Sequence, residues 1–363
     1  MREDKDAKQV VTEEEEPTES ITKNNVDMTQ TIASSIVKQK KSISDKSPKK
    51  QATTLLSADK TQVAKINSKE LSFTHLDKLF WPEDKITKRD LLIYYHQVAP
   101  YILPYIKDRP QSLYRFPDGY NGKSFYQKDV TDKVPDWAET YLYHSEGDSE
   151  DKHFLVAKDE ASLLFMVNFG CIEINPWSST VKKPDNPDWC LLDLDPGNKT
   201  TFNNVIDAAN IIRYLLDDAK IPSYPKTSGA TGIHIYIPLG KKYTYDQSKE
   251  FARVIVALVQ ERTAKFTTIE RQVSERGGKL YLDFLQNRPQ ATLAAPYSVR
   301  PKPGATVSMP LHWEEVKHGL KMKDFTLKNV PSLLKERGDL FKNVLGKGID
   351  MAKALSALDT ANV

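Results

Sequence analysis

Apolar side chains recur every three to four residues in three stretches of the chain, which is the spacing of a helix that buries one face. The first stretch starts after Thr87, a residue suited to an N-cap, and its helix is expected to stop around Pro100. The other two stretches are residues 202–221 and 245–263. The pattern therefore predicts three amphipathic helices.

Shorter apolar or alternating stretches predict strands. Residues 111–129 alternate aromatic and polar side chains around Asp118-Gly119, the pattern of a hairpin or two short strands. Residues 161–177 predict a short helix that runs into a strand. Further strands are predicted within residues 189–197, 227–239 and 279–287, and helices at 310–320 and 330–344. Strands and helices interleave without strict βαβ repetition, which favours an α/β or α+β fold with helices packed on a sheet.

The first part of the chain has a different composition. Residues 1–66 are rich in Lys, Glu, Ser and Thr, include the runs EEEE and KQKK, and contain no aromatic residue. Such a segment cannot bury enough apolar surface to offset its chain entropy. We therefore expect a disordered tail or linker over residues 1–66 and one folded domain over residues 67–363.

Composition sets broad limits on the class of protein. The chain has 363 residues with 39% hydrophobic residues, and no apolar run is long enough to cross a bilayer, so we expect a cytoplasmic protein without a membrane partner. Cys171 and Cys190 both lie in apolar stretches, which is typical of reduced core thiols. The net charge of +3 does not by itself separate a DNA-binding enzyme from other proteins.

Two carboxylates follow an apolar run in the stretch WCLLDLDPG, residues 189–197. Because a strand alternates faces, Asp193 and Asp195 point the same way, and Leu192 and Leu194 point into the core. Two carboxylates on one face repel unless a divalent cation lies between them, and Mg²⁺ and Mn²⁺ prefer oxygen ligands. The alternative is a solvated strand end, because Asp-Pro-Gly is ordinary turn chemistry.

A third carboxylate lies in the stretch KLYLDFLQN. Asp283 stands within an otherwise apolar strand, which is a costly position unless the carboxylate is paired or bound to metal. Three carboxylates would permit a site with two ions. Such ions activate an attacking hydroxyl, neutralise a transferring phosphoryl group and stabilise the leaving oxygen.

The stretch TSGATGIHIYIPL predicts a loop that could receive an anion. Gly229 and Gly232 let the backbone come close to a ligand and expose successive N–H groups, Ser228 offers a hydroxyl, and His234 could donate to a phosphate. The spacing is not that of a P-loop. Alone, the two glycines are a weak signal, and a histidine such as His234 is more often a half-buried structural residue than a phosphate ligand.

Taken together, these motifs resemble a known family. LDLDPG, TSGATGIHIYIPL, YLDFLQN and APYSVR occur in this order, with FTHLDKLFWPEDKITKRDLLIYYHQVAPYILPYI before them and DLFKNVLGKGID after them. This resembles the polymerase domain of bacterial DNA ligase D, a branch of the archaeo-eukaryotic primase superfamily, over about residues 70–350. The resemblance implies a primase-polymerase fold, with mixed sheets flanked by helices and a central active-site cleft.

The resemblance also implies an activity. Members of this family are template-directed nucleotidyltransferases of non-homologous end joining, which fill gaps, extend broken ends, prefer ribonucleotides and work with two Mn²⁺ or Mg²⁺ ions. The implied partners are DNA ends and gapped DNA with a 5′-phosphate, NTP or dNTP, and possible partners are Ku and a ligase. The ligase motif Lys-x-Asp-Gly does not occur in the chain. The sequence leaves open a stand-alone polymerase or one domain of a larger enzyme.

Site residues follow from the resemblance by position. It assigns catalysis and metal binding to Asp193, Asp195 and Asp283. It places the incoming nucleotide against Ser228, Gly229, His234, Gln286, Arg300, Arg276, Lys279 and Asn175. It assigns DNA binding to Lys78, Lys88, Phe125 and Tyr126, where the lysines would hold the 5′-phosphate beyond a gap and the aromatic rings would stack on bases. Without the resemblance, these lysines are interpreted as surface charges and the rings as packing under the hairpin.

Two positions depart from the family pattern. Thr231 stands where relatives often have Lys, which would remove a cation that Arg300 or Lys279 could replace. Asn175 stands where many relatives have His, and an Asn side chain can hydrogen-bond a sugar hydroxyl but cannot act as an acid. We expect these changes to affect nucleotide affinity and sugar preference.

Two other functions fit part of the pattern. A Mn²⁺-dependent glycosyltransferase also uses Asp-x-Asp to hold a nucleotide diphosphate, but it does not predict the third strand aspartate and the serine-glycine loop. A module that bridges DNA ends, with a vestigial metal site, would bind gapped duplex with normal salt dependence and incorporate nothing.

Overall fold

The computed structural model of the protein describes residues 56–144 and 151–360. They belong to one compact unit that begins at Thr54. The predicted tail extends too far, because strand β1 (Gln62–Ile66) pairs antiparallel with β2 (Lys69–Phe73) and Leu56 is buried. Strand β2 buries Leu71 and Phe73, and β1 pairs along its edge. Residues 1–55 lie outside the described residues, so the tail there stays a prediction.

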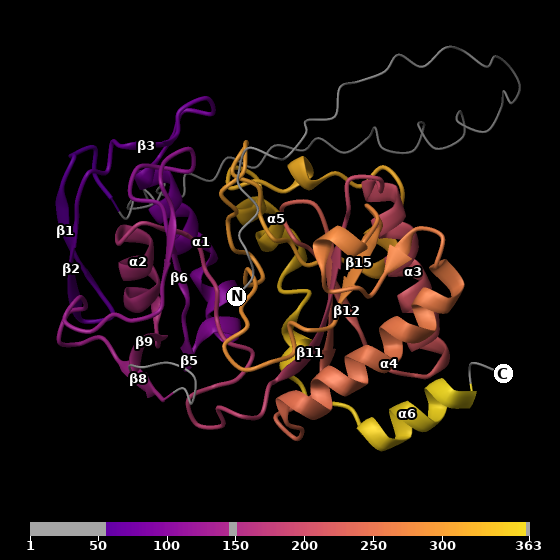
Figure 1. The fold of residues 1–363 in the computed structure, drawn as a ribbon. Helices are drawn as coiled ribbons and strands as arrows, with labels where there is room; N and C mark the ends of the chain where they lie inside the picture. Colours follow the sequence, from indigo (N-terminus) through magenta and orange to yellow (C-terminus); the bar gives the residue numbers. More distant parts are fainter. Residues whose placement is uncertain (1–55, 145–150, 361–363) are drawn as a thin grey trace, which may run out of the picture. The chain divides into compact units, whose positions relative to one another are not determined.

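A five-stranded sheet forms the centre of the unit. Its strand order is β12-β13-β11-β15-β14. The strands are β11 (Trp189–Asp195), β12 (Tyr224–Thr227), β13 (Ile233–Pro238), β14 (Thr267–Thr268) and β15 (Leu280–Asp283). The central strand β11 runs antiparallel to both of its neighbours. Helices α3 (Phe202–Asp218) and α4 (Tyr245–Thr263) pack on one face of this sheet (Figure 1).

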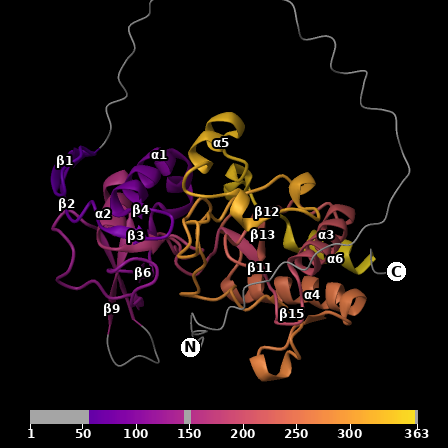
Figure 2. The same cartoon turned by 90° about the horizontal axis from the view of Figure 1, so that it is seen from above.

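The N-terminal half of the unit is built from small antiparallel sheets and two helices. One sheet has the order β10-β6-β7, another β5-β9-β8, and β3 pairs with β4. Their bounds are β3 (Leu79–Trp81), β4 (Ile86–Thr87), β5 (Arg109–Pro110), β6 (Leu113–Arg115), β7 (Phe125–Gln127), β8 (Thr140–Tyr143), β9 (Lys152–Ala157) and β10 (Cys171–Glu173). Helices α1 (Lys88–Ile106) and α2 (Glu160–Asn168) pack on each other. Figures 1 and 2 show this half on the side of the main sheet away from α3 and α4.

Most predicted elements are confirmed. The predicted hairpin is the β6–β7 pair, and the predicted short helix and strand are α2 and β10. The strands predicted within residues 189–197, 227–239 and 279–287 are β11, β13 and β15. The mixed architecture confirms the predicted fold class. Both cysteines are free and fully buried, and burial raises the pKa of each thiol to about 12, which confirms the expected core thiols. Among the helices of the described ranges, none has both the length and the apolar character that a membrane crossing requires.

Helix α1 starts where predicted and ends later. Thr87 Oγ1 accepts from the Asp90 amide at 3.2 Å, and the Asp90 carboxylate accepts from the Thr87 amide at 2.7 Å, so the capping box is complete. The predicted stop at Pro100 is wrong, since the helix continues through Pro100 and Pro104 to Ile106. Its buried face continues over these last turns, so burial outweighs the backbone hydrogen bonds that the prolines remove.

The C-terminal helices differ from the prediction. Residues 310–320 hold only the 3₁₀ turn η2 (Trp313–Glu315), and the Leu311 amide bonds the Pro225 carbonyl of β12 (3.0 Å). The predicted helix 330–344 is divided into α5 (Val330–Arg337) and the 3₁₀ turn η4 (Lys342–Leu345). Gly338, with φ 70°, ends α5 as helix C-terminal glycines often do. Helix α6 (Met351–Thr360) was not predicted.

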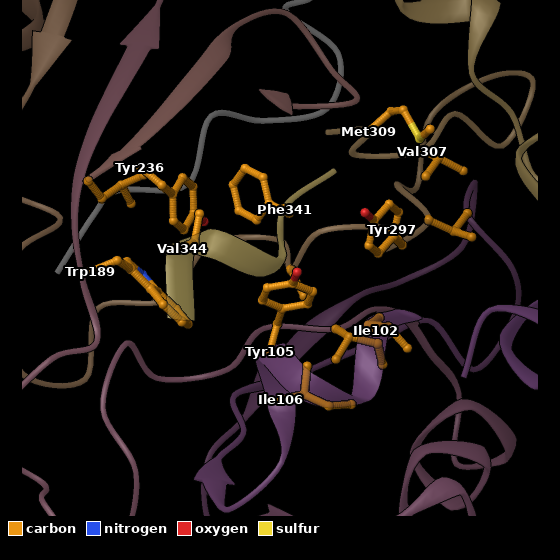
Figure 3. Close-up of a cluster of buried hydrophobic side chains, with 14 of the residues drawn as sticks. Ile102, Tyr105, Ile106, Trp189, Tyr236, Tyr297, Val307, Met309, Phe341 and Val344 are labelled. Atoms are coloured by element: carbon orange, nitrogen blue, oxygen red, sulfur yellow. The ribbon is translucent and has the colours of Figure 1, made fainter. Parts of the chain in front are cut away.

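An aromatic cluster connects α1 to the main sheet (Figure 3). Phe341 lies between the two, with its ring centroid 5.7 Å from Tyr105 of α1 and 5.0 Å from Tyr236 of β13. Tyr236 in turn packs on Trp189 at 5.5 Å. The Tyr105 hydroxyl donates to Asp339 at 2.7 Å. The segment that contains Phe341 therefore holds the N-terminal half against the sheet.

We predict that Phe341→Ala lowers the free energy of unfolding by about 3–5 kcal/mol, because it removes a fully packed ring from this cluster. Chemical denaturation measures the loss. Phe125→Ala is the matched control, since Phe125 is 45% exposed and its removal should cost only about 0.5 kcal/mol. Equal losses in the two variants would contradict this role of Phe341.

Candidate active site

Strand β11 presents its two aspartates on the face away from the helices. The Cys190 thiol contacts the Ser248 carbonyl of α4 at 3.6 Å, so the even-numbered residues of β11 face that helix. Asp193 and Asp195 point the other way, as predicted. The two leucines that alternate with them are fully buried. Asp193 itself is 5% exposed, so its carboxylate is largely withdrawn from water.

Neighbouring strands bring two more predicted residues beside Asp193. In the sheet register Asp193 lies directly opposite Asp283 of β15 and directly opposite His234 of β13. Directly opposed residues share a face and have Cβ atoms about 4.5–5.5 Å apart. The Asp283 carboxylate accepts from the Leu285 amide at 2.8 Å and from Gln286 Nε2 at 2.9 Å. Asp283 and Gln286 are therefore part of the carboxylate face.

The carboxylate face has the right donors for a hard cation. Asp193 and Asp283 are both 5% exposed and oppose each other, and Asp195 lies at the next outward position, opposite Tyr281. Such an all-oxygen set suits Mg²⁺ or Mn²⁺. Within residues 56–144 and 151–360, however, no three His, Cys, Asp or Glu side chains are grouped closely enough to hold one ion. The predicted site for two ions therefore stays a prediction.

His234 lies between Asp193 and a buried lysine. Its Nε2 atom is 3.4 Å from Asp193 Oδ1, and its Nδ1 atom is 2.8 Å from Lys226 Nζ. Lys226 is fully buried, and its ammonium group also contacts the Ala294 carbonyl at 3.0 Å and Ser308 Oγ at 2.5 Å. The position of His234 beside the carboxylates agrees with its predicted place, and Lys226 is a site residue that the sequence analysis missed.

Burial holds the pKa of Lys226 well below its usual value, and the charge of Arg300 acts in the same direction. The Asp193 and Glu173 carboxylates act against this shift. A lysine in the middle of the buried strand β12, two residues before Ser228, is the signal in the sequence that could have identified it.

The loop after β12 is organised around a serine hydroxyl. Ser228 Oγ accepts from the amides of Ala230 at 3.1 Å, Thr231 at 3.1 Å and Gly232 at 2.9 Å. The expectation that these N–H groups face an anion is therefore wrong in this arrangement, because the serine side chain satisfies them. The Ser228 hydroxyl accepts these hydrogen bonds and still has an O–H of its own. This O–H can donate a hydrogen bond to a phosphate oxygen.

Both loop glycines are required by close backbone approach. Gly229 has φ +70°, and a Cβ atom there would lie 2.8 Å from the Ser308 amide. A Cβ atom on Gly232 would lie 2.1 Å from the Leu194 carbonyl of β11. The loop is therefore pressed onto the strand that carries the aspartates, which places Ser228 and the carboxylates in one region.

Arg300 lies against this loop and is held by a buried glutamate. Its Nε atom donates to Glu173 at 2.7 Å, and its guanidinium also bonds the Ser228 carbonyl. Asn175 is 2% exposed, and its side chain lies 3.5 Å from the Glu173 carbonyl. Arg300 therefore lies against the loop, whereas Asn175 contacts the backbone of the glutamate that holds Arg300. Glu173 was not predicted, because nothing in its local sequence indicates the distant arginine that it meets.

Arg276 and Lys279 occupy different places. The Arg276 guanidinium lies over the Tyr281 ring at 3.7 Å, and Tyr281 pairs with Asp195, so this arginine is at the carboxylate end of the sheet. Lys279 instead donates to the Ala264 carbonyl at the end of α4 (2.6 Å). Its ammonium is therefore held away from the loop, which does not support the expectation that it replaces a cation at that position.

The two lysines expected to bind a 5′-phosphate are neighbours. The Lys88 amide donates to the Lys78 carbonyl at 2.8 Å. Lys78 Nζ lies 2.6 Å from both the Pro117 carbonyl and Asp118, and Lys88 Nζ donates to the Thr74 carbonyl at 2.9 Å. Burial, with the charge of Lys78, lowers the pKa of Lys88 to about 8. Lys88 is only 6% exposed, so it is not an ordinary surface charge.

The aromatic residues of β7 are exposed. Phe125 and Tyr126 are 45% and 46% exposed, so they are not core residues under the hairpin. The Tyr126 ring stacks on Tyr114, with centroids 4.2 Å apart and planes 5° apart. Arg115 lies 5.2 Å above Phe125. Exposed rings of this kind can receive bases by stacking.

A pocket adjoins the carboxylate face. Its lining includes Pro176, Trp189, Leu191, Tyr236, Gln286 and Ala295. Leu191 is two residues before Asp193 on the same face of β11, so one wall of the pocket lies on the strand face that carries the carboxylates.

This combination of fold and site defines the primase-polymerase class. The chain superposes on the polymerase domain from Mycobacterium tuberculosis ligase D in complex with DNA, with a TM-score of 0.71 and 25% identity, covering 77% of this chain and 99% of that one. Residues 87–341 match the family described as LigD, primase-polymerase domain. The chain belongs to this family.

Similar proteins include longer ones. The chain is 35% identical over 279 residues to the bifunctional non-homologous end joining protein LigD of Bacillus subtilis (strain 168), covering 76% of this chain and 44% of that protein. It is 29% identical over 265 residues to the multifunctional non-homologous end joining protein LigD of Pseudomonas aeruginosa, covering 72% of this chain and 31% of that protein. It thus matches less than half the length of either relative.

We predict that Gly232→Ala destabilises the protein by about 1–3 kcal/mol or more, because the new methyl group would overlap the Leu194 carbonyl. Urea denaturation measures the change. Thr231→Ala in the same loop is the control, since Thr231 is exposed and its truncation should cost only about 0.5 kcal/mol. A Gly232→Ala protein as stable as the control would show that the loop does not press on β11.

Proposed function

We propose that the chain is a template-directed, divalent-metal-dependent nucleotidyltransferase that fills gaps and extends broken ends in bacterial non-homologous end joining, with a preference for ribonucleotides. The observation that carries the proposal is the sheet register that sets Asp193 directly between Asp283 and His234. Membership in the LigD primase-polymerase family supports it, and so do the relatives' names, which specify non-homologous end joining.

In this proposal the primer 3′-hydroxyl loses its proton to solvent and its oxygen forms a bond to the α-phosphorus of the nucleotide. The bond from the α-phosphorus to the oxygen of the β-phosphate breaks, and diphosphate leaves. Asp193, Asp195 and Asp283 would hold the two Mn²⁺ or Mg²⁺ ions, which activate the hydroxyl and neutralise the developing charge. The chain's own donors hold the triphosphate. The Ser228 hydroxyl and the His234 Nε2–H would each donate a hydrogen bond to a phosphate oxygen.

The remaining nucleotide contacts would come from both halves of the unit. Arg300 adds a cation next to the loop, where Glu173 orients its guanidinium. Gly229 allows the close approach of the phosphates, and Asn175 hydrogen-bonds the sugar. In addition, Gln286 lines the pocket beside the carboxylate face, and Arg276 lies over Tyr281, the residue opposite Asp195 in the sheet.

The DNA would be held at two places. Lys78 and Lys88, at the start of α1, bind the 5′-phosphate beyond a gap, with the positive end of the helix dipole adding to their charge. To do so, Lys78 exchanges its contact with Asp118 for the phosphate. Phe125 and Tyr126 stack on unpaired bases. Recruitment by Ku and joining by a ligase are further parts of this proposal.

A module that binds DNA ends without catalysis is the second candidate. One observation favours it: within the described ranges, the carboxylates do not form a closed group of three metal ligands. Both candidates would bind gapped duplex, so only nucleotide incorporation distinguishes them.

We expect the protein to extend a labelled gapped duplex with NTPs and Mn²⁺, and the double variant Asp193→Asn/Asp195→Asn to lose more than about 100-fold of this rate. Metal ligands should matter at least as much as the residues that orient them. Asp207→Asn is the control, because Asp207 is a surface carboxylate bound to His318 and should keep full activity. Equal extension by wild type and double variant rejects the catalytic assignment, and a wild type that binds DNA but adds no nucleotide favours the second candidate.

We predict that the affinity gained from a 5′-phosphate falls as the pH rises from 7 to 9.5. The pKa of Lys88 is about 8, so its ammonium group is charged below that pH and becomes a neutral amine above it. The phosphate has its second pKa near about 6 and stays a dianion throughout. Fluorescence anisotropy with phosphorylated and unphosphorylated gapped duplex measures the difference. In Lys88→Met the gain should be small and independent of pH, and a wild-type gain that is constant over this range would contradict the pocket.

A further inference from the structure

Four ionisable side chains form one row across the main sheet. Lys226 of β12 lies opposite His234 of β13, His234 lies opposite Asp193 of β11, and Asp193 lies opposite Asp283 of β15. Their exposures are 0%, 2%, 5% and 5% in that order. At such burial each proton in the row must have a defined partner, because an unsatisfied polar group is costly.

The contacts of Lys226 determine which way its protons point. The Ala294 carbonyl can only accept a hydrogen bond. Ser308 Oγ donates its own proton to the Thr227 carbonyl at 2.9 Å, so it accepts from Lys226. Two positions on Lys226 Nζ are therefore donors. The third faces His234 Nδ1 at 2.8 Å, a distance that requires one proton between the two nitrogens.

Two arrangements of that proton satisfy all of these contacts. In one, the Lys226 ammonium donates to Nδ1 of a neutral His234, whose proton is then on Nε2. In the other, a neutral Lys226 amine accepts from Nδ1 of a charged His234, which also carries a proton on Nε2. Both give the pair a single positive charge and the same Nε2–H.

Other arrangements conflict with the neighbouring atoms. If both residues were charged, two N–H groups would oppose each other across 2.8 Å. If both were neutral with the shared proton on Nδ1, a bare Nε2 would face Asp193 Oδ1 at 3.4 Å, which sets two acceptors against each other. Arg300 also disfavours a second positive charge near Lys226.

We propose that Lys226 is a positioning residue whose hydrogen bond with His234 Nδ1 keeps the His234 Nε2–H directed at the carboxylate face. His234 is then a fixed donor for a phosphate oxygen and cannot turn into an acceptor that would repel it. The phosphate ligand rests on the proposed function, whereas the proton position on His234 is a property of the ligand-free protein and can be measured there.

The test is ¹⁵N NMR of the histidine side chains in metal-free, nucleotide-free protein at one neutral pH. His234→Gln identifies the His234 signals by their loss. Wild type is expected to show a protonated Nε2. A wild-type His234 with its proton on Nδ1 and a bare Nε2 overturns the proposal without any variant of Lys226.

The contribution of Lys226 is separated from that of Asp193 by removing the carboxylate. Asp193→Ala should keep the Nε2 proton, because the hydrogen bond between Lys226 and His234 Nδ1 remains. Asp193→Ala/Lys226→Met should populate the Nδ1–H form, and Asp193→Ala/Lys226→Gln should restore Nε2–H, because the Gln amide is again a donor. Asp193→Ala/Ser308→Ala is the matched control, which removes another contact of Lys226 and should leave His234 unchanged.

Two results overturn the proposal in these variants. One is loss of the Nε2 proton in Asp193→Ala alone, which would assign the proton to the influence of Asp193. The other is an identical His234 spectrum in Asp193→Ala and a folded Asp193→Ala/Lys226→Met. If that double variant does not fold, the single variant still decides. Because no measurement uses turnover, an inactive wild type would reject the proposed function and leave this result standing.

Discussion

The site depends on the antiparallel register of β11 between β13 and β15. This register sets Lys226, His234, Asp193 and Asp283 in one row across four strands, with cationic side chains at one end and anionic side chains at the other. A shift of one residue would turn the β11 aspartates towards α3 and α4, where apolar side chains pack. Burying these charges is tolerable because each lies beside a hydrogen-bonding partner or an opposite charge, and the apolar face of the same strands supplies the burial that holds the register.

The second constraint is the attachment of the N-terminal half to this sheet. The C-terminal segment inserts Phe341 between α1 and β13, and the Tyr105 and Tyr297 hydroxyls both donate to Asp339. This attachment matters for the site, because Glu173 comes from the N-terminal half and holds Arg300 against the loop of the main sheet. The position of Arg300 therefore depends on how the N-terminal half is attached to the main sheet.

The loop and the carboxylates differ in how completely they are organised. The loop is already formed, because the Ser228 hydroxyl accepts three backbone amides and the two glycines allow close contact with β11 and Ser308. The carboxylates share a face without closing into a group of three metal ligands within the described ranges. Two carboxylates on one face repel each other, and in the proposed function the cations between them would offset this repulsion.

Local sequence patterns were sufficient to predict the parts of this protein that neighbouring residues form. Two-residue alternation in WCLLDLDPG was enough to place Asp193 and Asp195 on one face, helical spacing located α3 and α4, and the capping pair Thr87 and Asp90 started α1. Motif order also indicated the family, and with it the meeting of Asp283 and His234 beside Asp193. Other features became visible only in the folded structure. Helix α1 continues through Pro100, and contacts join separate segments: Glu173 with Arg300, Lys279 with the end of α4, and Lys226 with His234. Hydrophobic periodicity depends on residues that are close in the sequence. Strand register and the pairing of buried charges depend on burial and hydrogen bonds between distant segments, so local patterns cannot predict them.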